Sequence, residues 1–96
     1  MGQFRKYYRN PDFIFRHVAG EAVLIPLMKD VADLEAIFSL NEVGVFIWEQ
    51  MEHPITIGNL KKLLVSEFEV EAEVLKNDLT HFIEELLGAG IILEAK

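Results

Sequence analysis

The fold is decided at residues 39–49, which read SLNEVGVFIWE. Before Asn41 the pattern is that of a strand, with Ala36, Phe38 and Leu40 on one face and Glu35, Ile37 and Ser39 on the other. After Asn41 apolar residues recur at the spacing of a helix. Asn41 is a good helix N-cap because its side-chain oxygen can accept a backbone N–H that the helix leaves unpaired. This stretch therefore predicts a strand that ends at Leu40 and a helix that begins directly after Asn41.

Three strands are expected before that helix. Residues 13–18 are rich in aromatic and β-branched side chains, and Gly20 favours a turn after them because glycine tolerates positive φ. Residues 21–28 form the second strand, in which Pro26 marks an edge or the end of the paired region. Residues 35–40 form the third strand. Three strands with short links favour an antiparallel meander.

Three helices are expected after the strands. The first ends before Pro54, because a residue that precedes proline avoids the helical region. Thr56 caps the second, and residues 71–87 carry the apolar spacing of the third, with glycines just beyond as C-cap candidates. Phe46 and Trp48 on the first helix are interpreted as structural residues that hold the helices to the sheet.

This order of elements predicts an α+β fold: a three-stranded antiparallel sheet followed by a three-helix, winged helix-turn-helix-like bundle. Residues 1–96 are interpreted as one domain. For each of the two end segments, two structural interpretations remain open. Residues 1–10, basic and aromatic, are either a mobile end or a packed lead-in to the first strand, and residues 91–93 are either a short closing strand or a packed tail.

Charge and composition narrow the class of protein. The formal net charge is −7; residues 1–30 carry five basic and three acidic groups, and residues 31–96 carry four basic and thirteen acidic groups. The acidic second half repels nucleic acid and anionic lipid and attracts basic partners, although an acidic surface also simply keeps a small domain soluble. There is no cysteine, no signal peptide is expected, and the longest apolar run is too short to span a bilayer, so a cytoplasmic protein is expected.

No catalytic motif is present. The sequence lacks a glycine-rich phosphate loop, a nucleophile elbow and the HExxH pattern. His17, His53 and His81 fall in different expected elements, so neither a metal site nor a cofactor is expected. The chain is therefore interpreted as a binding protein rather than an enzyme.

A winged helix also suggests DNA binding, but the third helix argues against it. Residues 71–87 carry one lysine, Lys76, and five carboxylates, whereas a recognition helix usually presents Arg or Lys. A small winged-helix regulatory or nucleic-acid-binding module is kept as the alternative function. A salt-sensitive gel shift with random duplex DNA separates the two classes.

Several stretches together resemble the PqqD family. Residues 39–49 are similar to its signature of Leu-Asn, a glycine three residues after the asparagine, and an Ile-Trp pair; Val43 departs from it, because many members carry threonine there. Further similarity lies in the first hairpin (residues 20–24), the start of the second helix (residues 56–60), the third helix (residues 78–86) and the glycine-led tail (residues 90–92). The resemblance runs from Pro11 to Leu93.

The resemblance implies a non-catalytic, peptide-binding role in the biosynthesis of ribosomally made, post-translationally modified peptides. Such a recognition element acts as a chaperone that captures the leader of a precursor peptide by strand addition and presents it to a separate modifying enzyme. In pyrroloquinoline quinone biosynthesis that enzyme is a radical-SAM protein. PqqD-like chains also occur in other peptide pathways, so the pathway, the precursor and the enzyme stay open, as does the choice between monomer and dimer.

The resemblance also implies where the peptide binds. An unpaired sheet edge can accept an extended segment, and the family docks its peptide on the third strand, residues 34–40, with the third helix as the other wall. For Ile83 and Leu87 an alternative of equal weight is that they are ordinary core residues and do not contact the peptide. The predicted peptide contacts are Leu34, Glu35, Ala36, Ile37, Phe38 and Ser39 on the strand, and Lys76, Thr80, Ile83 and Leu87 along one flank of the helix.

Overall fold

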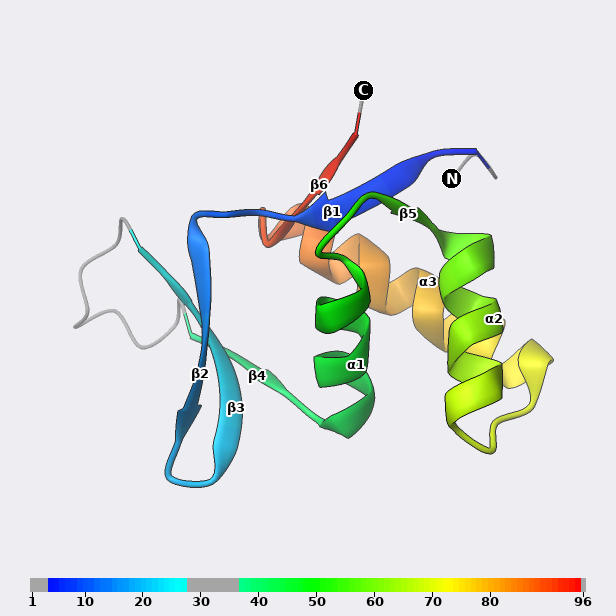
Figure 1. Cartoon of the computed structure of the whole chain (residues 1–96), viewed down its shortest axis with the longest axis horizontal. Helices are drawn as coiled ribbons and strands as arrows, with labels where there is room; N and C mark the ends of the chain where they lie inside the picture. Colours follow the sequence, from blue (N-terminus) through cyan, green and yellow to red (C-terminus); the bar gives the residue numbers. More distant parts are fainter. Residues whose placement is uncertain (1–3, 28–36, 96) are drawn as a thin grey trace.

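The computed structural model describes residues 4–27 and 37–95, which form two three-stranded antiparallel sheets and three helices (Figure 1). The predicted α+β class is confirmed. The expectation of one sheet is wrong, because a second sheet joins the two ends of the described chain. The winged helix-turn-helix resemblance is not confirmed. In the part of the chain that the structure describes, no helix is long and apolar enough to cross a membrane.

The first sheet, which we call the hairpin sheet, contains β2 (Phe13–Val18), β3 (Glu21–Pro26) and β4 (Phe38–Leu40) in the order β2-β3-β4. This is the predicted meander. Leu24 lies opposite Phe38, and Ala22 lies opposite Leu40, so these four side chains share the face that packs against the core. The strand β4 is shorter than predicted. Residues 28–36 lie outside the described residues, and with them the expected strand positions 28, 35 and 36.

A two-residue turn joins β2 to β3. Val18 pairs with Glu21, and the two residues between them, Ala19 and Gly20, have φ values of 52° and 84°. Positive φ at both central positions is the property of the type I′ turn, whose twist matches that of a hairpin. Pro26 lies at the other end of β3, opposite Phe13, which confirms that it marks the end of the paired region.

The second sheet, which we call the closing sheet, contains β1 (Lys6–Arg9), β5 (Ile55–Thr56) and β6 (Ile92–Glu94) in the order β5-β1-β6. It was not predicted as a sheet, although the packed lead-in and the short closing strand were among the alternatives for its outer parts. Tyr7 at the middle of β1 is buried, and Arg5 forms an ion pair with Glu94 at 3.2 Å. The sheet thereby ties three distant parts of the chain together.

The three helices are α1 (Glu42–Gln50), α2 (Ile57–Glu67) and α3 (Ala72–Gly88). Both predicted N-caps are confirmed. The Asn41 side chain accepts from the Gly44 N–H at 2.8 Å, and the Thr56 hydroxyl accepts from the Asn59 N–H at 3.1 Å. Gly90, just after α3, has a φ of 74°, a left-handed conformation that glycine adopts without strain.

The core lies between the helices and the inner faces of both sheets. Trp48 is 6% exposed within it, and the Arg9 guanidinium of β1 lies 5.5 Å from the centre of its ring. Phe46 is half-buried and meets Phe68 edge to face, with ring centroids 5.5 Å apart. The burial of Trp48 confirms its predicted structural position.

Candidate binding groove

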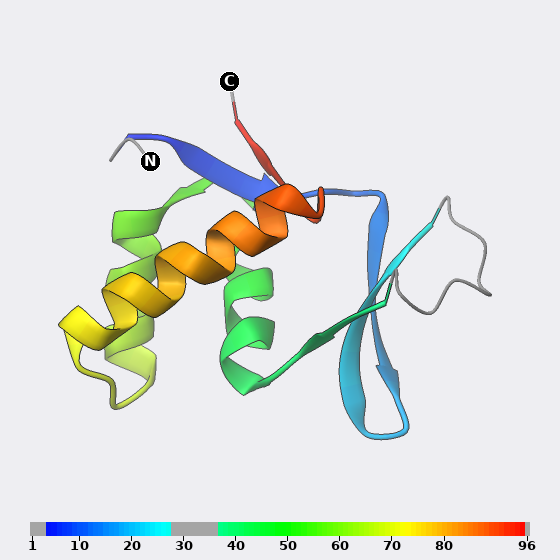
Figure 2. The ribbon, with the colours of Figure 1, turned by 180° about the vertical axis from the view of Figure 1, so that it is seen from behind.

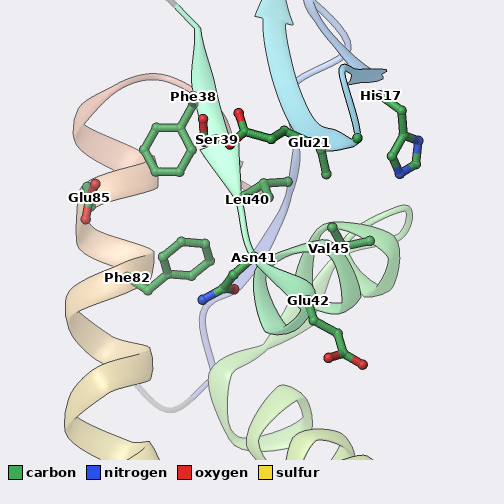
Figure 3. Close-up of a pocket in the computed structure, with 12 residues that line it drawn as sticks. His17, Glu21, Phe38, Ser39, Leu40, Asn41, Glu42, Val45, Phe82 and Glu85 are labelled. Carbon is green, nitrogen blue, oxygen red and sulfur yellow. The ribbon is translucent and has the colours of Figure 1, made fainter.

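The outer edge of β4 faces α3. The sheet ends at β4, so among the described residues no strand pairs with that edge. Phe38 from β4 and Phe82 from α3 approach each other across the gap, with ring centroids 6.4 Å apart (Figure 3). Viewed from behind, β4 runs from the hairpin sheet to the start of α1, and α3 crosses in front of α1 (Figure 2). An exposed strand edge beside a half-buried aromatic pair is suited to binding an extended peptide.

A cavity of about 750 Å³ surrounds β4, from the hairpin on one side to α3 on the other, and we call it the edge groove. It joins the end of the β2–β3 hairpin, the strand β4, the first turn of α1 and the second half of α3. The side chains of Phe38, Leu40 and Phe82 give it an apolar wall. Its described lining comprises His17, residues 20–22, residues 38–42, Val45, Phe82 and Glu85.

The rim of the edge groove is acidic. Glu21, Glu42 and Glu85 line it, and all three are exposed. Its described lining contains no lysine or arginine, and these carboxylates take part in no ion pair with another described residue. The groove thus combines an apolar wall with negative charge, which favours a guest that carries both apolar and basic side chains.

The strand residues predicted to contact a peptide lie partly in this groove. Phe38 and Ser39 line it, with Phe38 half-buried and Ser39 exposed. Ile37, directly before β4, is half-buried and does not line it. The other three predicted contacts, Leu34, Glu35 and Ala36, lie outside the described residues.

The helix residues predicted to contact a peptide lie elsewhere. Ile83 is fully buried in the core, and Leu87 is half-buried against it, which supports the alternative that both are core residues. The Thr80 hydroxyl donates to the Lys76 carbonyl at 2.9 Å. None of these four residues lines the edge groove. The structure presents a different flank of α3 to β4, which contains Phe82 and Glu85.

The sequence contained a signal for Phe82, but an ambiguous one. Phe82 and Ile83 are adjacent apolar residues about 100° apart on the helix, so either can point to the centre of the core. The structure places Ile83 there and leaves Phe82 at the side, against Phe38. Glu85 follows Phe82 at i+3 and so shares its flank.

No group of three or more His, Asp or Glu side chains comes close enough to hold a metal ion in residues 4–27 and 37–95. His17 lies at the groove, and the other two histidines are exposed on separate elements. The polar atoms at the groove are carboxylates, the Ser39 hydroxyl, the Asn41 amide and backbone groups.

Comparisons with known proteins give a family and a fold. The family model described as coenzyme PQQ synthesis protein D (PqqD) matches residues 21–92. A solved structure, "TbiB1 in Complex with the TbiA(beta) Leader Peptide", superposes with a TM-score of 0.69 at 21% identity, covering 88% of this chain and 93% of that one. At that identity the likeness speaks for the fold alone. No curated protein sequence matches the chain significantly.

Proposed function

Because the chain belongs to the PqqD family, we propose that it is a non-catalytic recognition element that binds the leader of a ribosomally made precursor peptide. The observation that carries the proposal is the edge of β4 lying against Phe82 of α3. The peptide adds as a further strand to β4, and its alternate side chains enter the edge groove. The similar TbiB1 structure is a complex with a leader peptide, which supports peptide binding by a protein of this fold.

The bound leader is then presented to a separate modifying enzyme. We propose a radical-SAM protein as that enzyme, in pyrroloquinoline quinone biosynthesis or a related peptide pathway, on the strength of the family resemblance. A gene for such an enzyme and a very short reading frame beside this protein's gene would support that assignment. A different class of modifying enzyme in that position would replace it.

The acidic rim sets the charge of the preferred peptide. Glu21, Glu42 and Glu85 favour a leader with basic residues on either side of its apolar positions. Electrostatic attraction of this kind acts mostly on the association rate and is screened by salt. Association should therefore slow as salt rises.

The proposal can be tested with a peptide ligand. Such a ligand is obtained by selecting, from a random peptide library displayed on phage, a sequence that binds this protein. Backbone amide shifts on adding the synthetic peptide should cluster in residues 37–40 of the strand and near Phe82 and Glu85 of α3. Shifts confined to residues 4–9 or to α2 would place the binding site elsewhere and overturn the model.

Two charge substitutions in the hairpin sheet make the test quantitative. Ile37→Asp puts a charge beside the docking edge and should weaken binding by about tenfold, or about 1.4 kcal/mol. Ile14→Asp is the matched control, because Ile14 is half-buried on β2, at the far side of the same sheet, and does not line the edge groove. It should leave the affinity within about twofold. Equal effects of the two substitutions would argue against docking on β4.

A further inference from the structure

A second cavity lies beyond the end of β4. It holds about 320 Å³ and is bounded by the start of α1, the end of α2 and the first half of α3. We call it the helix pocket. Its walls are mostly apolar and include Val43, Leu64, Phe68 and Leu79, while Asp78 is exposed at its rim. A pocket of this kind accepts an apolar group.

The helix pocket adjoins the edge groove. Asn41 and Phe82 line both cavities. The strand β4 and the helix α3 run in opposite senses along the groove: Phe38 lies near Glu85, whereas Asn41 lies near Phe82 (Figure 3). A chain paired with β4 that continues past Leu40 therefore passes Asn41 and arrives at the helix pocket.

The Asn41 side chain stands at the junction with a fixed orientation. Its Oδ1 accepts from the Gly44 N–H at 2.8 Å, and a backbone N–H requires an oxygen there, so Nδ2 must point the other way. In Figure 3 this nitrogen lies on the side of Phe82 and α3. No hydrogen bond among the described residues uses its two donors. The cap of α1 thus aims an amide donor at the path of a peptide leaving β4.

We propose that the bound peptide extends past β4 and anchors one apolar side chain in the helix pocket, while Asn41 Nδ2 donates to a peptide carbonyl at the junction. This rests on the proposed function and adds a second subsite to it. The anchor is leucine, phenylalanine or a residue of similar size, since a cavity of about 150 Å³ already holds benzene. Because the pocket adjoins the edge groove at Asn41 and Phe82, the occupant is the same peptide and not a separate molecule.

The Asn41→Asp variant tests the donor without removing the cap. Aspartate caps a helix as well as asparagine does, so the Gly44 N–H keeps its acceptor. The Nδ2 donors are lost, and a carboxylate faces the peptide carbonyl instead. With the library-selected peptide, affinity should fall by about tenfold while the melting temperature does not fall.

Asn59→Asp is the matched control. It makes the same change of charge in the first turn of α2, where Asn59 is exposed and lines neither cavity. Its affinity should match that of the unchanged protein within about twofold. A second readout follows the side-chain methyls of Val43, Leu64 and Leu79, which should shift on adding the peptide. Replacing the anchor residue of the peptide by alanine should cancel those shifts.

The outcomes separate this inference from the proposed function. Amide shifts at residues 37–40 with unmoved pocket methyls, and equal affinities of the two Asn→Asp variants, would overturn the inference and leave strand addition standing. An absence of shifts at both places would overturn the two together. Methyl shifts with a free indole probe but none with the peptide would make the pocket a small-molecule site and would also overturn the inference.

Discussion

The two sheets of this protein contain the same number of strands but do different things. The hairpin sheet is built from neighbouring stretches of chain and ends at β4, whose outer edge has no partner strand in the described residues. The closing sheet joins β1, β5 and β6, which lie far apart in the sequence, and its middle strand carries the buried Tyr7. One sheet leaves a strand edge open, which is the edge that the proposed peptide would use, and the other uses its pairing to hold the chain ends together.

This difference separates stability from binding within a small protein. Substitutions beneath the closing sheet should lower the stability of the whole fold, because the core there is shared by all three helices. Substitutions at the outer parts of the hairpin sheet should have small effects on stability. The three pairs of substitutions below test that contrast, from the largest expected effect on stability to the smallest.

The largest effect is expected at Trp48, which packs in the core below Arg9 of β1. Trp48→Ala should lower the free energy of unfolding by about 3–5 kcal/mol, because it removes a large buried ring. Denaturant unfolding measures this, and amide exchange should rise earlier in β1 and β6 than in β2 and β3. Arg9→Gln keeps the ring and removes only the cation above it, so it should cost about 0.5–1 kcal/mol. A Trp48→Ala protein that unfolds like the unchanged one would show that the ring is not part of the core.

An intermediate effect is expected where β4 meets α1. A Cβ on Gly44 would lie 3.0 Å from Leu40 Cδ2 and 3.4 Å from Asn41 Oδ1. This crowding costs about 1–3 kcal/mol, and the helix preference of alanine offsets up to about 1 kcal/mol, so Gly44→Ala should cost about 1 kcal/mol net. Gly58→Ala is its counterpart in the first turn of α2, where the nearest atom is Thr56 Oγ1 at 4.0 Å. That substitution should be neutral or stabilise by up to about 1 kcal/mol, since alanine favours a helix. Thermal melts of the pair should therefore move apart, and a common direction would contradict the close packing at Gly44.

The contrast between the sheets also explains what the sequence could predict. The meander and both helix caps depend on neighbouring residues, such as Asn41 with Gly44 and Thr56 with Asn59, and their signals are local. The closing sheet has no such signal, because β5 has two residues and β1 reads Lys-Tyr-Tyr-Arg. Its pairing is fixed only once the helices bring its strands together.

The candidate groove was predicted in part for the same reason. That the edge strand faces the third helix was implied by the family resemblance. Which flank of α3 faces that strand depends on how the helix is rotated over the core. With apolar residues at both Phe82 and Ile83, the sequence does not fix that rotation, and burial of Ile83 decides it.

The smallest effect is expected at the turn between β2 and β3, which lies at the end of the hairpin sheet away from the closing sheet (Figure 1). Ala19 has a φ of 52°, which costs an L-residue about 1–2 kcal/mol, whereas glycine adopts it freely. Against this, glycine gives the unfolded chain more conformational entropy, which destabilises the fold by about 0.5–1 kcal/mol. The balance is that Ala19→Gly should stabilise the fold by about 0.5 kcal/mol, or about 2–4 °C in melting temperature. Ala89→Gly is the control, because Ala89 has a φ of −86° and only the entropic cost applies. The melting temperature should rise for Ala19→Gly and fall for Ala89→Gly, and neither substitution should change the affinity for the peptide. A destabilised Ala19→Gly protein would mean that the turn is not strained and that the hairpin is held by its strands alone.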